Sequence, residues 1–197
     1  MLHRAKIAVM SVNLNVNLTV NQHSLLSGIA LAEMRRLFDA EYRADFGDWD
    51  PDGPYGYAPA DWHVLAWLGR RLVGHVGFQR RVIEVGGVEV AVAGTGGMLV
   101  APEARGCGVG KRLLFRAQRS MIKDAKLDFG YLGCRPAVVG FYESAGWVRI
   151  RAQESHTDRL DPALTVVNDS SPILICPALR PVTEWPNGDV DLRGGAW

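Results

Sequence analysis

The sequence contains one glycine-rich segment whose spacing suits the binding of an anion, and it reads Arg105-Gly106-Cys107-Gly108-Val109-Gly110. Glycines let backbone N–H groups approach a phosphate closely, and the N-terminus of a following helix adds about half a positive charge. Arg105 and Lys111 place cationic side chains at the two ends of the segment. The segment therefore predicts a phosphate-binding turn between a strand and a helix, and a purely structural turn is the alternative.

Two familiar nucleotide-binding loops do not fit this segment. A dinucleotide-binding loop opens a parallel βαβ array and has an acidic residue about 20 positions later, at the end of the second strand. Here Asp128 opens the next predicted strand, and three runs typical of antiparallel strands come before the loop. A Walker loop requires Ser or Thr after its lysine, whereas Arg112 follows Lys111. A dinucleotide site and nucleotide hydrolysis are both disfavoured.

The loop and a second motif together resemble the GCN5-related N-acetyltransferase superfamily. The loop has the form R-x-x-G-x-G and follows a run that ends Met98-Leu99-Val100-Ala101-Pro102. The second motif, Phe141-Tyr142-Glu143-Ser144-Ala145-Gly146-Trp147, is similar to the F-Y-x-x-x-G-F segment of that superfamily. The resemblance covers residues 62–151. It implies an α/β (α+β) fold, a single domain with a mixed, mostly antiparallel central sheet flanked by helices.

The resemblance also implies the donor and the residues that bind it. Acetyl-coenzyme A (acetyl-CoA) would bind with its pyrophosphate on the backbone amides of the loop and its pantetheine arm along the preceding strand. Tyr142 would protonate the departing sulfur as a general acid, and a core aromatic residue is the alternative interpretation. The implied cofactor-binding residues are Met98, Leu99, Val100, Arg105, Gly106, Cys107, Gly108, Val109, Gly110 and Lys111.

Two further segments resemble particular branches of the superfamily. Gln79-Arg80-Arg81 with Ile83, and residues 184–190, are similar to aminoglycoside 2′-N-acetyltransferases, including those that act on kasugamycin. This implies acetylation of an aminoglycoside 2′-amine and antibiotic resistance. Residues 184–190 also resemble nodulation-factor N-acyltransferases, which would imply a longer fatty acyl group. The alternatives are another amino sugar, a polyamine or a peptide amine as the acceptor, or an acyl-CoA-binding module without turnover.

A cationic acceptor would suit the acidic and aromatic residues of two segments. Residues 45–61 contain aspartates but no lysine or arginine, although aspartates beside Gly and Pro also commonly cap turns. Residues 182–197 combine acidic side chains with Trp185 and Trp197, and they are expected to close the acceptor site as a tail. The candidate substrate-binding residues are Asp45, Asp48, Trp49, Glu154, Glu184, Trp185 and Asp191.

The group that removes the amine proton is a separate question. An ammonium group must lose a proton before it can attack a thioester. The resistance acetyltransferases place a glutamate on their fourth strand, and the corresponding position here is Gly96. Another segment must therefore supply the base. The catalytic candidates are Tyr142 as the acid, with Asp189 and the carboxylate of Trp197 as bases; Asp45, Glu154 and His156 are further candidates, and His63 and His75 are interpreted as structural.

The elements that position these residues follow from hydrophobic patterning and turn residues. Apolar spacing of helical type predicts helices over residues 24–42, 109–126 and 137–145. The many Gly, Pro and Asp residues of 46–60 predict a long loop. We expect an N-terminal extension over 1–11, the acetyltransferase domain over 12–181 and the tail over 182–197. The predicted strands are 12–20, 62–68, 72–85, 88–100, 129–134, 147–151 and 173–179.

Composition restricts the class of partner. The 197 residues include 22 basic and 21 acidic side chains, so the net charge of +1 provides no general attraction for nucleic acid or an anionic membrane. No apolar run reaches the roughly 18 residues of a membrane span, and we expect a cytoplasmic protein. Three widely spaced cysteines predict reduced thiols, and no metal site is expected. The expected partner is a small-molecule amine, and a homodimer is possible.

Overall fold

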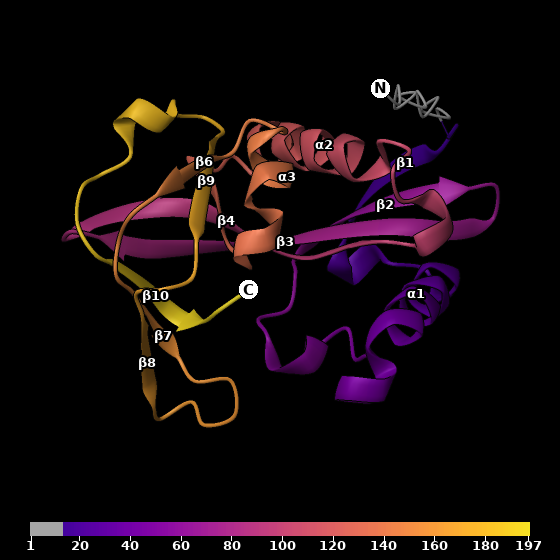
Figure 1. The fold of residues 1–197 in the computed structure, drawn as a ribbon, viewed down its shortest axis with the longest axis horizontal. Coiled ribbons are helices and arrows are strands. Elements are labelled where there is room, and N and C mark those ends of the chain that lie inside the picture. The colour runs from indigo at the N-terminus through magenta and orange to yellow at the C-terminus, as the bar shows by residue number, and fades with distance from the viewer. Residues whose placement is uncertain (1–13) are drawn as a thin grey trace, which may run out of the picture.

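A computed structural model describes residues 14–197, which form one ten-stranded sheet with helices packed against it (Figure 1). The predicted extension 1–11 and the start of the predicted strand 12–20 lie outside the described residues. Most strand pairs are antiparallel, and β4–β5 and β10–β7 are parallel. The prediction of a mixed, mostly antiparallel sheet flanked by helices is confirmed. Within the described part of the chain, no helix combines the length and apolarity needed to cross a membrane.

The N-terminal half of the sheet is an antiparallel meander, as its hairpin turns predicted. β3 pairs with β2 from Arg71 to Phe78 and with β4 from Gly74 to Val85, around the Gly86-Gly87 turn. β1 pairs with β2 and begins at Asn17, later than the alternating pattern predicted, because the register with β2 starts there. The strands are β1 (Asn17–Gln22), β2 (Trp62–Leu68), β3 (Arg71–Val85) and β4 (Val88–Val100).

Two long helices cover opposite faces of this meander. α1 (Gly28–Phe46) is capped by Ser27, whose hydroxyl accepts from the Ala30 amide at 3.2 Å, so it starts later than the helix predicted over residues 24–42. α2 (Val109–Lys123) begins directly after the glycine-rich loop. Phe38 of α1 packs on the ring of His75, whereas α2 packs against Gly74, the preceding residue of β3. Successive residues of a strand face opposite sides, so the two helices enclose the sheet.

The C-terminal half contains three strands that the sequence did not predict. β7 (Glu154–Thr157) and β8 (Thr165–Asn168) form a hairpin, and β10 (Val190–Gly195) pairs with both β3 and β7. β7 is polar throughout, and β10 has only two buried apolar residues before its glycines, so neither shows an apolar alternation long enough to predict a strand. The predicted elements are β5 (Phe129–Gly133), α3 (Val139–Glu143), β6 (Val148–Ile150) and β9 (Ile173–Pro177).

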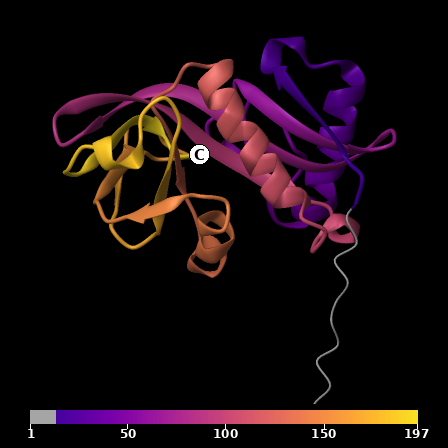
Figure 2. The same cartoon turned by 90° about the horizontal axis from the view of Figure 1, so that it is seen from above.

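The C-terminal end of the chain lies in the middle of the molecule. Figures 1 and 2 both place it between the N-terminal meander and the strands of the C-terminal half. The backbone N–H of Ala58, in the long loop, donates to the carbonyl of Ala196 at 3.0 Å. Segments far apart in the sequence therefore meet at one place in the centre of the fold.

Candidate active site

A gap between two parallel strands opens the interior of the sheet. β4 and β5 pair at three positions, Val92–Gly94 with residues 129–131, and then separate. Beyond Gly94, β4 has no partner on that edge among the described strands, while β3 still pairs with its other edge. Backbone groups of β4 on the open edge are therefore available to a ligand.

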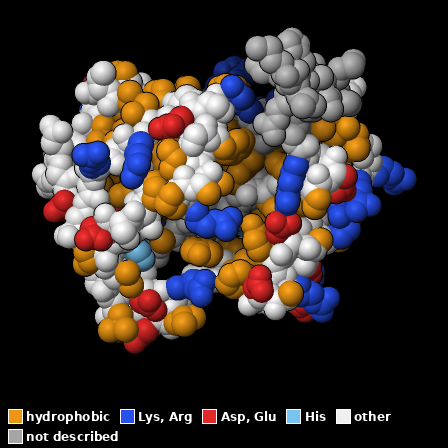
Figure 3. Space-filling model, in the orientation of Figure 1, with side chains coloured by type: hydrophobic (Ala, Val, Ile, Leu, Met, Phe, Trp, Pro, Cys, Tyr) orange, Lys and Arg blue, Asp and Glu red, His pale blue; other side chains and the backbone are white. Residues whose placement is uncertain are grey.

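The gap leads into a cavity of about 1240 Å³, which we call the central cavity. It is lined by α1, residues 49–60, the facing parts of β3 and β4, residues 104–111, β5 and α3, and the ends of β7 and β10. Figure 3 shows hydrophobic side chains gathered in the middle of this face, with cationic side chains around them. A mostly apolar cavity with a few polar groups is typical of a small-molecule site.

The glycine-rich loop forms one wall of the central cavity. Gly106 and Gly108 both have φ near 75°, a left-handed conformation that glycine adopts without strain, and Gly108 is the N-cap of α2. The predicted cofactor residues line the cavity with the exception of Cys107, whose thiol donates weakly to the carbonyl of Arg105 at 3.6 Å. The guanidinium of Arg105 is bound to Glu41 at 2.7 Å and to the carbonyl of Val100 at 2.9 Å. Its main role is therefore to hold the loop against α1.

Tyr142 lies in the same cavity, on α3, as expected for a group near the reacting atoms. Its ring packs against Phe141 and Trp147, with centroids 5.1 and 6.1 Å away. Burial raises the pKa of its phenol well above the ordinary value, and the nearby Cys134 and Tyr42 add to the effect. The phenol therefore keeps its proton at neutral pH and can serve as a donor.

A carboxylate and an imidazole on β7 form the polar part of the cavity. Glu154 and His156 are two residues apart and so lie on the same face of β7. Glu154 is only 5% exposed, and one of its oxygens accepts the phenol proton of Tyr131 from β5. Burial, together with the negative charge of Glu154, raises the pKa of Tyr131, so the phenol remains the donor.

The second oxygen of Glu154 lies 3.2 Å from Nδ1 of His156. The contact has ion-pair distance, but Nδ1 makes no aligned hydrogen bond within residues 14–197. A carboxylate at Nδ1 favours a proton on that nitrogen and leaves the lone pair on Nε2. The pair therefore has the composition of a general base. The spacing E-x-H on a strand was a signal for it that the sequence already contained.

Trp197 fills the space beside two glycines of β4. A Cβ on Gly94 would overlap the indole ring, and a Cβ on Gly96 would come within 3.1 Å of the main-chain carbonyl carbon of Trp197. The indole N–H donates to Gln79 at 3.0 Å, and the guanidinium of Arg81 lies 4.1 Å from the ring centroid. Burial lowers the pKa of Arg81 to about 10. Trp197, the last residue of the tail, thus takes the space that a side chain at position 96 would need.

Most of the predicted acidic residues do not line the central cavity. Asp48 pairs with Arg43 at 2.7 Å, Glu184 pairs with Arg180 at 3.0 Å, and Asp191 accepts from the amide of Arg193 at 2.8 Å. These are the turn and surface roles expected of Asp and Glu near glycines. Of the predicted catalytic and substrate residues, the structure brings together Tyr142, Trp197, Trp49 and Glu154, and it leaves outside Asp45, Asp48, Glu184, Trp185, Asp189 and Asp191.

The aromatic wall of the cavity combines the predicted Trp49 with aromatic residues of α1 that were not predicted as part of the site. Trp49 stacks on Phe38 with centroids 4.9 Å apart, and Tyr42 packs against Tyr55 at 5.8 Å. Burial raises the pKa of Tyr55 to about 12. Phe38 and Tyr42 belong to the apolar stripe of α1, so helical spacing made them indistinguishable from core residues.

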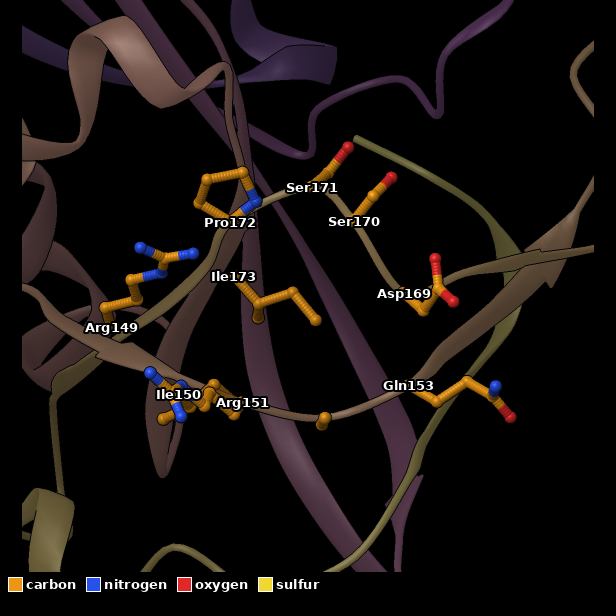
Figure 4. A pocket seen from close by; sticks show the side chains of 10 residues that line it. Arg149, Ile150, Arg151, Gln153, Asp169, Ser170, Ser171, Pro172 and Ile173 are labelled. Carbon is orange, nitrogen blue, oxygen red and sulfur yellow. The ribbon is translucent and has the colours of Figure 1, made fainter.

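A second hollow, of about 340 Å³, lies between β6 and residues 169–173 (Figure 4). Arg149 and Asp169 lie at opposite ends of it, and its side chains do not converge on one point. The reactive groups described above all belong to the central cavity, which we therefore take as the candidate active site.

Comparisons with known proteins identify a family for the sequence and a known fold for the structure. The family model for nodulation protein A (NodA) matches residues 14–196. Nodulation protein A of Bradyrhizobium sp. (strain NC92) is 29% identical over 140 residues, which are 67% of this chain and 66% of that protein. The Mesorhizobium plurifarium protein is 24% identical over 186 residues, which are 89% of this chain and 93% of that protein.

A solved structure shows the same architecture. The GNAT-family N-acetyltransferase YhbS of Escherichia coli, in complex with CoA, has a TM-score of 0.59 at 16% identity, over 91% of this chain and 90% of that one. The fold is therefore that of the GCN5-related N-acetyltransferases, as predicted. The expectation of an aminoglycoside branch is not supported, because the family model and the relatives carry the nodulation name instead.

Proposed function

The chain belongs to the nodulation protein A (NodA) family, and from that membership and the central cavity we propose that it transfers an acyl group from acyl-CoA to the amine of an amino sugar. It is an acyltransferase of the GCN5-related fold. One observation carries the proposal of the acceptor reaction: the same cavity is lined by the glycine-rich loop, by Tyr142 and by the Glu154–His156 pair.

The residues present fit coenzyme A as the carrier of the acyl group. The open edge of β4 beyond Gly94 offers backbone groups to an extended pantetheine arm, in the way that a sheet edge accepts another strand. Gly106, Gly108 and the first turn of α2 offer N–H groups to a pyrophosphate. Lys111 lines the cavity beside them and supplies a positive charge. The thioester supplies an activated carbonyl carbon.

The residues that line the cavity can account for every bond and proton in the transfer. The amine nitrogen forms a bond to the acyl carbon, and the bond from that carbon to sulfur breaks. The amine proton passes to Nε2 of His156, whose Nδ1 lies beside the Glu154 carboxylate, and His156 then releases the proton to solvent. Tyr142 gives its proton to the departing sulfur and regains one from solvent. No covalent enzyme intermediate is required.

Amino sugars suit the walls of the cavity better than polyamines do. Trp49, Tyr55 and Trp197 present rings with apolar faces and polar edges, which match the two sides of a sugar ring. The acidic side chains that would attract a polycation lie mostly outside the cavity. Kasugamycin and oligomers of glucosamine are both amino sugars, and we propose that an acceptor with few charges, such as a glucosamine oligomer, is preferred.

The release of free CoA thiol during turnover tests the proposal. Purified protein with acetyl-CoA is offered glucosamine oligomers, kasugamycin, tobramycin, spermidine and a lysine peptide in turn. We expect turnover with an amino sugar, and we expect Glu154→Gln to lower kcat by about 100-fold or more, because His156 loses the carboxylate that supports it as the general base. Glu184→Gln is the matched control, because Glu184 is exposed and pairs with Arg180 on the surface.

Three outcomes would contradict parts of this proposal. Turnover with spermidine or the peptide alone would make the acceptor class wrong. Tight binding of CoA without turnover of any acceptor would indicate a binding module rather than an enzyme. Equal activity of Glu154→Gln and Glu184→Gln would remove the base assigned to β7.

A longer acyl group is a second candidate for the donor. The aromatic wall formed by Phe38, Tyr42, Phe46 and Tyr55 adds apolar surface to a cavity that is larger than an acetyl group needs. Competition between acetyl-, octanoyl- and palmitoyl-CoA tests it. A higher kcat/KM for a long-chain donor would support the second candidate, and a preference for acetyl-CoA would exclude it.

A further inference from the structure

Three histidines form a hydrogen-bonded chain from the protein surface to the wall of the central cavity. Nδ1 of His75 lies 2.7 Å from the carbonyl oxygen of Gly97 on β4. Nε2 of His75 lies 2.9 Å from Nδ1 of His63, and Nε2 of His63 lies 3.0 Å from Nδ1 of His23. The outer nitrogen of His23 lies 3.2 Å from a carboxylate oxygen of Asp52. His63 and His75 are 2% and 3% exposed, respectively.

The carbonyl at the inner end fixes the direction of every hydrogen bond in the chain. A carbonyl oxygen can only accept, so Nδ1 of His75 must carry its proton. Nε2 of His75 is then an acceptor, and Nδ1 of His63 must donate to it. By the same reasoning, Nδ1 of His23 donates to Nε2 of His63. The outer nitrogen of His23 faces the Asp52 carboxylate at 3.2 Å, which completes the chain at the surface.

The carbonyl that anchors the chain belongs to a bulge in β4. The register pairs His75 with Leu99 and Gly77 with Gly96, so one residue of β3 lies opposite both Gly97 and Met98. Gly97 has φ of 59°, in the left-handed region. A side chain on Gly97 would come within 3.2 Å of the His75 ring, and one on Gly77 within 3.3 Å. The two glycines therefore leave a slot in which the imidazole holds the bulge.

The bulge lies where β4 has left β5, beside the residues of β4 that we assign to the pantetheine arm. Met98, Leu99 and Val100 line the cavity directly after Gly97. The direction in which their backbone N–H groups point depends on the conformation of Gly97. A change in the bulge would therefore move the backbone groups that face the pantetheine arm and its thioester, without any change in the side chains of the site.

A proton relay from the acceptor amine to solvent is the competing role, and the hydrogen-bond direction argues against it. To pass a proton outward, the inner nitrogen of His75 would have to receive one from the cavity. That nitrogen already carries a proton and donates it in a hydrogen bond to a carbonyl oxygen. A carbonyl oxygen does not take up a proton at neutral pH. The neutral state of the inner pair agrees, because burial lowers the pKa of His63 to about 2 and that of His75 to about 4.

We propose that His75 is a positioning residue for acyl transfer: its Nδ1–H holds the Gly97 carbonyl and fixes the β4 bulge, and His63 and His23 select the tautomer that allows this. The proposal rests on the proposed function, since the step that the bulge serves is transfer from a thioester. It extends that function to residues that hold the backbone of β4 and do not themselves react.

The tautomers can be observed without any assay of activity. Long-range ¹⁵N–¹H correlation spectra of the imidazole rings distinguish a proton on Nδ1 from one on Nε2. We expect His63 and His75 of the wild-type protein to be neutral with the proton on Nδ1, the less common form in water. A proton on Nε2 of His75 would overturn the proposal.

Two variants of His75 separate the bond to Gly97 from the bond to His63. In His75→Asn, the side-chain amide nitrogen stands near the former Nδ1 and can still donate to Gly97. The longer side chain in His75→Gln places its amide near the former Nε2 and loses that bond. We expect kcat of His75→Gln to fall about tenfold below that of His75→Asn, while KM for both substrates changes little.

The outcomes separate this proposal from the function on which it rests. Equal kcat for the Asn and Gln variants of an active wild-type enzyme would overturn the positioning role and leave the proposed function intact. A wild-type enzyme inactive towards every acceptor would overturn the proposed function, and the ¹⁵N spectra would still support or overturn the hydrogen-bond chain. Recovery of the wild-type kcat by His75→Asn would support the proposal.

Discussion

At the acceptor side of the cavity, the indole ring of Trp197 fills the space that a side chain at Gly94 would take. A Cβ at position 94 would overlap the indole, which is also held by Gln79 and Arg81. Gly94→Ala must therefore displace Trp197 from the wall. We expect KM for the amino-sugar acceptor to rise about tenfold and KM for acyl-CoA to stay the same, as measured by steady-state kinetics.

Gly28→Ala is the matched control for this substitution. Gly28 begins α1 outside the lining of the central cavity, and a Cβ there would meet nothing within 4 Å. We expect kinetics close to those of the wild type. An unchanged acceptor KM in Gly94→Ala would show that Trp197 does not form part of the acceptor wall.

Individual site residues could be predicted where their signal is local in the sequence. The loop glycines and Tyr142 sit in motifs with fixed spacing, and the structure places them at the central cavity. The acceptor residues were sought by counting acidic side chains, and most of these cap turns or pair on the surface. Tyr131 has no distinguishing signal at all, because a buried tyrosine on a strand is usually a core residue. Its role depends on Glu154, 23 residues away.

The pairing of β2 and β3 buries two histidines, and this makes stability depend on pH. Burial lowers the pKa of His63 to about 2 and of His75 to about 4, both below the ordinary value of 6.5. The unfolded chain therefore binds protons more readily than the folded one, so stability is complete above pH 6.5 and is lost as the pH falls towards the folded values. Each histidine contributes at most about 1.4 kcal/mol per pH unit.

We expect the free energy of unfolding to fall by roughly 2 to 4 kcal/mol between pH 7 and pH 5 because of these two residues. Urea unfolding at both pH values measures it. His75→Asn removes one titrating ring and should reduce the difference by about half. The same pH dependence in the wild type and in His75→Asn would mean that His75 is not buried in its neutral form.

Strands with a long apolar pattern could be predicted from the sequence, and strands with a short or polar pattern could not. The meander of residues 62–100 has long β-branched runs and a Gly-Gly turn, and its three strands formed as predicted. β7, β8 and β10 are short, and β7 is polar. They are strands because other strands of the same sheet pair with them, and these pairings cannot be recognised from the local sequence. β7 carries Glu154 and His156, which the sequence named separately as candidates for the base, but without the strand their place on one face could not be predicted.

The tail predicted over 182–197 forms part of the sheet of the whole molecule. Val190 and Leu192 of β10 are each 1% exposed, and the strand joins β3 to β7. Removal of residues 182–197 would leave one edge of each neighbour unpaired and uncover two aliphatic side chains, each worth roughly 1.5 to 3 kcal/mol. We expect the shortened chain to lose several kcal/mol of stability or fail to fold cooperatively, as measured by urea unfolding followed by circular dichroism.

Arg193→Ala provides the comparison for the deletion. Arg193 lies on the same strand, but its side chain pairs with Glu84 and Glu89 on the surface. Such pairs contribute about 0 to 1 kcal/mol, so little change is expected. A shortened chain that unfolds at the wild-type urea concentration would show that the tail is separable from the domain.

The central claim for the molecule is direct transfer of an acyl group to an amine. A covalent route through a thioester on the enzyme would need a cysteine, and Cys134 lines the cavity. Burial raises the pKa of Cys134, which leaves less of the reactive thiolate at neutral pH. Direct attack by the amine, with Glu154 and His156 taking its proton, therefore agrees better with the site.

A single-turnover experiment tests direct transfer. It uses ¹³C-labelled acyl-CoA and a glucosamine oligomer, and mass spectrometry follows the label on both the protein and the acceptor. The expected result is label on the acceptor nitrogen, with equimolar free CoA and no labelled protein at any time. Label on Cys134 or another protein residue before it reaches the acceptor, or label released only as the free acid, would contradict it.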